Sequence, residues 1–324
     1  MQIHPFDLTQ GQIIFIVQIL FLEDIFKMLK KEIFSRPVLL LLLGALIISF
    51  SSVLVKTSHV SSTLSAFYRV LFGSFFLIIA CLIKKEFQKR DVKKNLLAVL
   101  CGLLFAFDLW AWHLSIQYVG PGLSTVLANC QVFVLALVGF LVFKEKIGVK
   151  FVISLPLAFL GLFLIIGIDT DQLTREYVIG IVLGGGAALF YSMFLLLLRK
   201  LQSDKTDFSL FYYLMVVSVA SSFFLGGKIY ISKGSFGIPD MTTLLSLLCL
   251  GLFIQMVAWV MISHALPKVK ASHAGLILLL QPALSFVWDV VFFNRPTGTS
   301  GWVGVTLVLM AIYLGMTGTE KFSK

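Results

Sequence analysis

The sequence predicts an all-α integral membrane protein whose ten transmembrane helices form two inverted five-helix repeats. Hydrophobic residues make up 59% of the 324 residues and charged residues 13%, whereas about a quarter of the residues in a typical soluble protein are charged. The apolar runs are about twenty residues long, which suits a membrane-spanning helix and exceeds a barrel strand. A weak internal repeat also places Gln131 on Gln281 and Phe143 on Phe293, at an offset of 150 residues. Such repeats are common in membrane transporters.

The N-terminal segment, residues 1–36, differs from the rest of the chain. Its apolar part, 13–22, is too short to span a bilayer and is followed by charged residues. One interpretation is an amphipathic helix lying on the cytoplasmic membrane surface. Another is that translation begins at Met28, so that residues 1–27 do not belong to the native protein. A signal peptide is disfavoured because its charges would precede the apolar part.

Ten apolar spans follow, and their short connections leave no room for an extramembrane domain. Residues 37–168 form the first predicted repeat and residues 177–318 form the second. The predicted spans are 37–56, 61–83, 95–118, 121–143, 149–168, 177–198, 208–227, 242–265, 271–293 and 300–318. Each is expected to be helical because backbone groups in lipid must be satisfied within the segment. Pro156 and Pro282 are expected to kink spans 5 and 9.

The distribution of basic residues predicts the orientation. With the N-terminus inside, the inner segments hold 20 of the 26 Lys and Arg residues and the outer connections hold 5, while Arg69 lies within a span. This asymmetry predicts that both termini are cytoplasmic. Because each repeat has an odd number of spans, the second must enter the bilayer from the opposite side, which makes the repeats inverted.

Composition also argues against several other functions. The net charge of +10 is explained by the basic inner connections, which are too short for a nucleic-acid-binding domain. The four cysteines lie inside apolar spans and form no CxxC pair. His113, His264 and His273 lack the spacing of metal ligands, and no GKS or GKT sequence follows the glycines at 180–186. No metal or cofactor is therefore expected.

Five short motifs recur in an order that resembles one known family. They are Ser51-Ser52 with Lys56 in span 1, Ala66-Phe67-Tyr68-Arg69 in span 2, Ser115-Ile116-Gln117-Tyr118-Val119 ending span 3, Phe143-Lys144-Glu145 closing span 4, and Gln281-Pro282 in span 9. Over residues 36–318 the chain resembles the drug/metabolite transporter (DMT) superfamily, in its ten-span EamA type. Two departures are that Asn294-Arg295 stand where Glu145 stands in the first half, and that Val132 stands where Pro282 does in the second.

The resemblance implies carrier-mediated movement of small metabolites across the inner membrane by alternating access. Members resemble exporters of amino acids and related compounds, and the superfamily also includes importers and exchangers of nucleotide-linked solutes. A secondary active transporter driven by protons or a counter-substrate is therefore expected, with a zwitterionic or amine-bearing solute and export as the leading interpretation. An integral membrane enzyme is disfavoured because the sequence has no HExxH motif and no paired acids.

Two charged residues inside the spans are the leading candidates for substrate binding. A charge at mid-membrane costs about 2.5–3.5 kcal/mol on insertion scales, so it should face a cavity or a partner. Asp108 lies halfway along span 3, with Trp112 and Ser115 on the same helix face. It would bind a substrate amine or a proton, or it would lock the bundle through a salt bridge. Arg69 would bind a substrate carboxylate or pair with Asp108 or Asp289, and structural pairing is favoured.

Polar and aromatic residues complete the predicted substrate site. Gln131 and Gln281 occupy equivalent repeat positions near the middle of spans 4 and 9, where repeat-built carriers place their sites. Trp259 is the second-half counterpart of the aromatic face of span 3, and Tyr191 adds a polar contact from span 6. The alternative for all four is packing or hydrogen bonding between helices. Asp289 and Lys56 are expected near the outer surface, and glycines 180, 184, 185 and 186 are expected to allow close helix approach.

Overall fold

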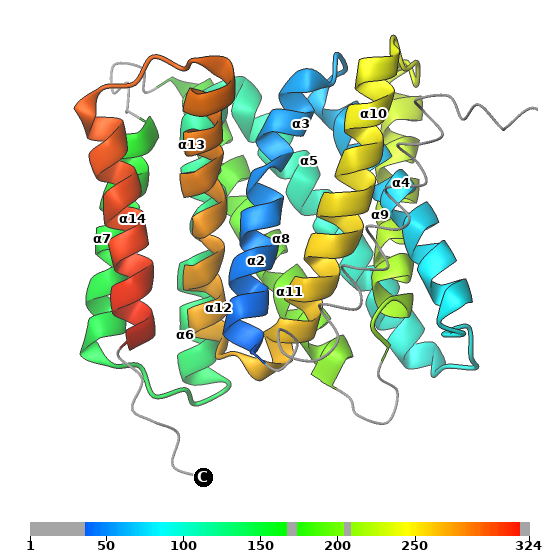
Figure 1. Cartoon of the computed structure of the whole chain (residues 1–324), viewed down its shortest axis with the longest axis horizontal. Helices are drawn as coiled ribbons and strands as arrows, with labels where there is room; N and C mark the ends of the chain where they lie inside the picture. The colour runs from blue at the N-terminus through cyan, green and yellow to red at the C-terminus, as the bar shows by residue number, and fades with distance from the viewer. Residues whose placement is uncertain (1–35, 167–173, 204–208, 318–324) are drawn as a thin grey trace, which may run out of the picture.

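Ten helical passes lie side by side in a computed structural model that describes residues 36–166, 174–203 and 209–317 (Figure 1). Within these ranges ten helices are long and apolar enough to cross a membrane, which confirms the predicted number. The predicted N-terminal segment lies outside the described residues, apart from Arg36. The passes are Pro37–Thr57, Ser62–Ile83, Val92–Gly120, Leu123–Leu141, Val149–Ile166, Arg175–Ser203, Tyr212–Ile231, Met241–Lys268, Ala271–Phe293 and Thr299–Thr317.

Several passes are built from more than one helical segment. The elements are α2 (Pro37–Ser49), α3 (Ser51–Thr57), α4 (Ser62–Ile83), α5 (Val92–Asn129), α6 (Gln131–Leu141), α7 (Val149–Ile166), α8 (Arg175–Ser203), α9 (Tyr212–Ile231), α10 (Met241–Cys249), the π-helix η2 (Leu250–Ala258), α11 (Trp259–Ala265), the 3-10 turn η3 (Leu266–Lys268), α12 (Ala271–Leu278), α13 (Leu280–Phe293) and α14 (Thr299–Thr317). Helix α5 contributes to spans 3 and 4, because Gly120 turns the chain between them with φ of 76°.

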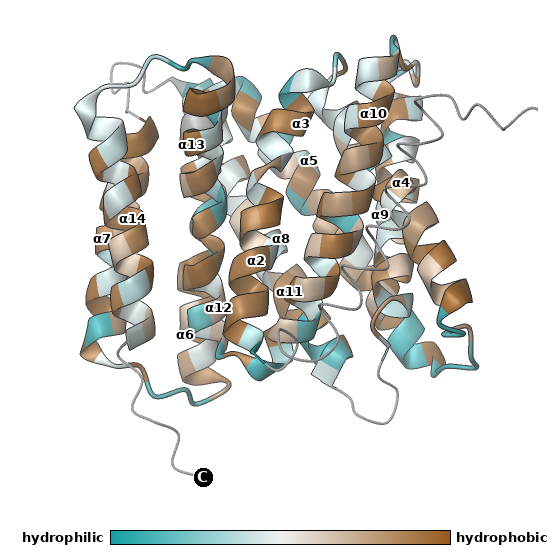
Figure 2. Cartoon of the chain, viewed as in Figure 1, coloured by the Kyte–Doolittle hydropathy of each residue, from teal (hydrophilic) through white to brown (hydrophobic). Residues whose placement is uncertain are grey.

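The helices are apolar along their length and polar at their ends, as Figure 2 shows. Side chains at several helix starts bind backbone N–H groups that have no partner within the helix. Ser61 caps α4 through the N–H of Leu64, Asp91 caps α5 through that of Lys93, and Asp240 caps α10 through that of Thr243. The predicted boundaries agree with these starts to within a few residues.

The contacts between helices follow the same pattern in the two halves of the chain. Helix α2 of span 1 packs against spans 8 and 9 through η2, α11 and α13, and α8 of span 6 packs against spans 3 and 4 through α5 and α6. Corresponding spans also pack directly on one another, as α4 on α9, α6 on α12 and α7 on α14. Every one of these pairings maps onto another, or onto itself, when spans 1–5 and 6–10 are interchanged.

Backbone conformation repeats between the halves as well. Among the described residues four that are not glycine have positive φ: Lys85 and Lys233 follow spans 2 and 7, and Lys144 and Asn294 follow spans 4 and 9. Spans 4 and 9 are also both interrupted, at Cys130 and Leu279, which are within one residue of matching positions. The chain therefore bends in the same places in each half, which is the relation expected of two copies of one unit.

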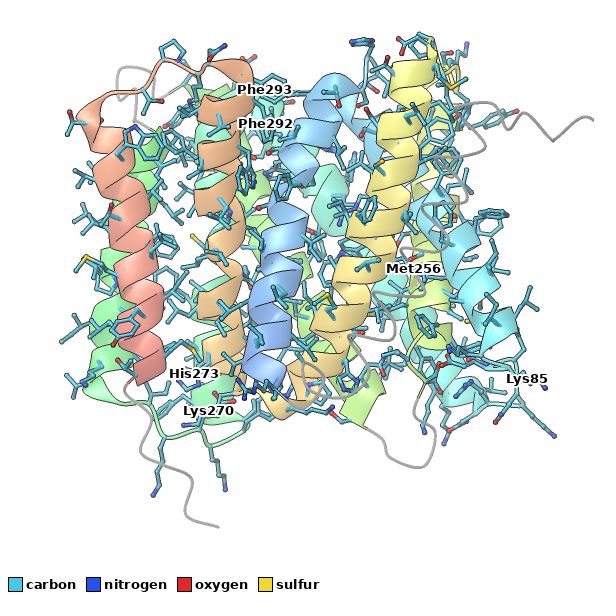
Figure 3. The ribbon with its side chains drawn as sticks, viewed as in Figure 1. Lys85, Met256, Lys270, His273, Phe292 and Phe293 are labelled. Atoms are coloured by element: carbon cyan, nitrogen blue, oxygen red, sulfur yellow. The ribbon has the colours of Figure 1, made fainter. Side chains whose placement is uncertain are left out.

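The two ends of the bundle differ in charge. Figure 3 places Lys85, Lys270 and His273 at one end, and Phe292 and Phe293 at the other. The first end, called here the basic end, also carries the basic residues of the connections at 84–94, 144–150 and 199–200. The other end is called the distal end and carries Lys56, Arg175, Lys233 and Arg295.

The glycines of span 6 fall into two classes. A Cβ atom on Gly180 would lie 2.5 Å from Val119 Cγ1, and one on Gly184 would lie 2.7 Å from Leu127 Cβ. These two glycines therefore allow span 6 to approach spans 3 and 4 closely. Close approach is not the role of Gly185 and Gly186, because a Cβ atom on either meets nothing within 4 Å. They lie on the open face of the same helix.

Candidate functional site

Span 8 is the central helix of the bundle. Of its most apolar stretch 78% is buried, against 50% or less for each of the other nine passes. Its middle third is the π-helix η2, and long π-helical segments are rare and are frequently found at functional sites. Gln255 lies within η2 and Trp259 begins the next helix, so the widened segment presents both residues near the level of Arg69 and Phe105.

Asp108 is deeply placed and lacks a protein partner. Its residue is 8% exposed, and it forms no hydrogen bond or ion pair with any residue that the structure describes. Arg69 on α4 is close enough to interact with it electrostatically, yet the two do not form an ion pair. The expected structural pairing of Arg69 with Asp108 is therefore wrong.

Arg69 is held instead by a polar chain that runs through the centre of the bundle. Its Nε donates a hydrogen bond to Oε1 of Gln255 at 3.2 Å, and Nε2 of Gln255 donates to Oγ of Ser218 on α9 at 3.0 Å. Gln255 is 1% exposed and Ser218 is fully buried. The guanidinium carbon of Arg69 lies 5.7 Å from the centre of the Phe105 ring. The terminal nitrogens of Arg69 have no hydrogen-bond partner among the described residues.

An aromatic cluster adjoins Arg69 through the ring of Phe105. Phe105 stacks on Phe194 at 4.6 Å, and Trp259 packs edge-on against both rings at 5.5 Å and 4.9 Å. Tyr191 lies edge-on to Trp259 at 6.3 Å. The indole N–H of Trp259 is buried without a hydrogen-bond partner. This cluster joins spans 3, 6 and 8 and forms an apolar wall beside the two charges.

The two repeat-related glutamines have different surroundings. Gln281 lies beside Tyr191, and Tyr191 lies near both Arg69 and Asp108. Gln131 is fully buried, and both polar atoms of its amide lack a partner. Its backbone carbonyl accepts a hydrogen bond from Ser192, which is adjacent to Tyr191 in sequence. Gln131 therefore contacts span 6 at Ser192. Among the described residues its buried side-chain amide has no hydrogen-bond partner, and the packing gives no explanation for this.

The structure brings five of the predicted site residues together and leaves two beside them. Arg69, Asp108, Tyr191, Trp259 and Gln281 are linked by the contacts just described. Gln131 reaches the group only through span 6, and Trp112 lies one turn beyond Asp108, where its ring packs against that of His113. Ser115, predicted to share the face of Asp108, instead donates a hydrogen bond to the Gly180 carbonyl at 2.8 Å and joins spans 3 and 6.

Sequence reasoning missed Gln255 and Ser218 as members of this site. A lone amide within the apolar stretch of span 8 was a usable signal, because polar groups in spans are costly and usually have a partner. The π-helix carries no comparable signal, since its sequence, LGLFIQMVA, is as compatible with an α-helix. No group of three or more metal-ligating side chains occurs in the parts of the chain that the structure describes.

At the distal end the halves are joined by ion pairs. Lys56 of span 1 lies 2.7 Å from Asp289 of span 9, and Arg295 lies 3.7 Å from the other oxygen of the same carboxylate. Lys56 was expected near the outer surface, and the structure adds a contact with Asp289 that the sequence did not indicate. His59 pairs with Asp240 at 2.8 Å, and this hydrogen bond holds the pKa of the Asp240 carboxyl below its ordinary value.

At the basic end two carboxylates of the first half bind helix starts of the second. Glu86 accepts hydrogen bonds from the Ser209 hydroxyl and from the backbone N–H groups that begin α9. Glu145 accepts from the N–H of Ala271 at 2.6 Å, and from the N–H and hydroxyl of Ser272 at 3.2 Å and 2.7 Å. A carboxylate is favourable there because helix N-termini are partially positive.

Comparison with known protein families assigns the chain to one of them. The profile of the EamA-like transporter family matches the chain twice, over residues 35–167 and 178–317. The chain belongs to the EamA-like transporter family. The two matches cover nearly all of the ten passes, and membership of this family agrees with the drug/metabolite transporter superfamily inferred from the motifs. The protein is thus a multi-pass membrane transporter.

Individual relatives agree with the family at low sequence identity. The uncharacterized transporter YxxF of Bacillus subtilis (strain 168) is 25% identical over 261 residues, which cover 78% of this chain and 79% of the relative. An uncharacterized transporter of Haemophilus influenzae is 26% identical over 170 residues, covering 50% of this chain and 55% of that protein. A protein known from a crystal structure superposes with a TM-score of 0.74 at 15% identity, covering 86% of this chain and 98% of its own, which shows a shared fold.

Proposed function

We propose that this EamA-family protein is a secondary active transporter that exports small zwitterionic or amine-bearing metabolites, such as amino acids, across the inner membrane. The observation that carries the proposal is that Asp108 and Arg69 lie near each other deep in the bundle without forming an ion pair. Opposite charges in an apolar interior normally pair, because an unpaired charge there is costly. A solute that carries both an amine and a carboxylate would satisfy both groups at once.

The arrangement of the ends supports alternating access as the mechanism. The halves are joined at the basic end through Glu86 and Glu145, and at the distal end through Lys56 and Asp289. The site lies between these two sets of contacts. A carrier must release one set while the other holds, so that the site opens to one side of the membrane at a time. We place the basic end and both termini in the cytoplasm, following the excess of Lys and Arg there.

Asp108→Asn tests the proposed site directly. The substitution keeps the shape of the side chain and removes its charge, so a bound amine loses a charge-assisted hydrogen bond worth about 1.5–3 kcal/mol, or about tenfold to a hundredfold in apparent affinity. Transport driven by a pH gradient should also lose its dependence on pH if Asp108 carries the coupled proton. The measurement is uptake and efflux of a labelled metabolite panel in proteoliposomes, with and without a pH gradient.

The matched control is Glu176→Gln, which removes one carboxylate from the exposed first turn of α8 and should leave transport unchanged. A folded Asp108→Asn protein with wild-type transport and pH dependence would make Asp108 a structural residue. Transport of nucleotide-linked or cofactor-type solutes in exchange, in place of amino acids, would favour the alternative of an importer or exchanger of the same superfamily. Wild-type protein that moves no solute under any gradient would overturn the proposal.

A further inference from the structure

Arg69 is oriented by its contacts in a way that leaves part of its guanidinium group unused. The group has five N–H donors in a rigid planar fork. One of them, on Nε, is bound to Gln255 at 3.2 Å, and the two terminal nitrogens bind no described residue. Two parallel N–H bonds from an arginine fork match the two oxygens of a carboxylate. The unoccupied part of Arg69 therefore has the geometry of a carboxylate receptor.

Gln255 is itself fixed in place, so it can set the direction in which Arg69 points. Its Nε2 is bound to Ser218, which leaves Oε1 to face Arg69. Its side chain packs so closely on α4 that a Cβ atom added to Gly73 would lie 2.3 Å from Gln255 Cγ. The π-helix η2 further widens the turn from which Gln255 projects. An amide with both ends hydrogen-bonded and its stem packed against α4 is held facing Arg69.

Among the residues that the structure describes, no carboxylate binds the terminal nitrogens of Arg69. The acid nearest in the site, Asp108, forms no ion pair with it, and Asp289, the other expected partner, is bound to Lys56 and Arg295 at the distal end. We propose that Arg69, positioned by Gln255 and Ser218, is the subsite for the carboxylate group of the transported solute. This inference rests on the proposed transport function and adds to it the requirement for a carboxylate, together with Gln255 as a positioning residue.

The subsite predicts a specific discrimination between solutes. An amino acid and the amine formed by its decarboxylation carry the same side chain and the same ammonium group, and they differ only in the group that Arg69 would bind. A site built to hydrogen-bond a polar group rejects the analogue that lacks it, because the site's own donors are then left unpaired. The protein should therefore prefer the amino acid to its amine by about tenfold or more.

The test measures uptake and binding for such matched pairs, drawn from the common amino acids, with full-length protein in proteoliposomes and in detergent. Arg69→Gln should abolish the preference. Gln255→Glu keeps the shape and the acceptor toward Arg69 but supplies a protein carboxylate, so it should fold and still lower the preference by about tenfold, through a higher KM for the amino acid. A defect in packing alone would lower uptake of the amino acid and of its amine together and would keep the wild-type ratio. Ser222→Ala on α9 is the control, because that hydroxyl bonds only to its own helix at Val219.

The possible outcomes separate the subsite from the transport function. Transport of amino acids and their amines at equal rates by the wild type, or an unchanged ratio in folded Arg69→Gln and Gln255→Glu proteins, would overturn the carboxylate subsite and leave the transporter intact. Absence of both uptake and ligand-induced thermal stabilisation for every pair would overturn the subsite and the proposed amino-acid function together. A preference that is lost in both variants and kept in Ser222→Ala supports the proposal.

Discussion

Replacing Gly304 with valine is expected to lower the free energy of unfolding by about 3 kcal/mol or more, because two backbones meet at this residue. A Cβ atom on Gly304 of α14 would lie 2.5 Å from the Gly161 carbonyl oxygen and 2.8 Å from the Ile165 nitrogen of α7. A Cβ atom on Gly161 would lie 2.6 Å from the Gly304 carbonyl oxygen. Backbone atoms cannot rotate away as side chains do, so the helices must separate, and overpacking of this kind usually costs about 1–3 kcal/mol even for small additions.

Gly185→Ala is the matched control for this prediction and should have the opposite sign. Its Cβ atom would meet nothing within 4 Å, and alanine is favoured over glycine inside a helix by about 0.5–1 kcal/mol. Reversible unfolding of the purified protein in mixed detergent micelles measures both variants against the wild type. Equal stability of Gly304→Val and wild type would show that α7 and α14 are not in close contact in the membrane.

The ten spans could be predicted from the sequence because each depends on length and hydropathy alone. A run of about twenty apolar residues has few alternatives in a bilayer. The ends of the spans were marked by charged residues and by turns such as the one at Gly120, which adopts a backbone conformation suited to glycine. Spans 4 and 9 are interrupted close to Gln131 and Gln281. The sequence predicted a kink near Pro282 in span 9, but it gave no signal for the interruption at Cys130 in span 4.

The contacts within the site could not be predicted, because they depend on how helices rotate and widen after they assemble. Arg69 and Asp108 carry the charges of an ion pair, but Gln255, which lies within the π-helix, is the residue that binds Nε of Arg69. Asp289 found a partner 233 residues away in Lys56, a contact that no local pattern indicates. Gly184 and Gly185 are adjacent in sequence, and only the packing of span 4 distinguishes the one that is needed from the one that is not.

Replacing Glu145 with alanine is expected to destabilise the protein by about 2–4 kcal/mol and to loosen the basic end. The Glu145 carboxylate accepts three hydrogen bonds from the first residues of α12, and hydrogen bonds to a charged group are worth about 1.5–3 kcal/mol each before solvent replaces part of the loss. Unfolding of Glu145→Ala in the same micelle system gives the loss in stability. Cysteine labelling at Ser272 from the basic side, in a background without native cysteines, measures how often this end opens.

Gly139→Ala tests the same contact without removing the charge. A Cβ atom on Gly139 would lie 2.5 Å from Oε2 of Glu145, so the alanine must displace the carboxylate from the start of α12. If the contact matters through its hydrogen bonds, Gly139→Ala should share both the lower stability and the faster labelling of Glu145→Ala. If only Glu145→Ala shows them, the effect belongs to the lost charge among the basic residues around 144–150. The second half has Asn294-Arg295 in place of this acid, so no equivalent cap occurs among the described residues of the distal end. That end is joined by exposed ion pairs, which salt should weaken far more than it weakens the contacts of Glu145.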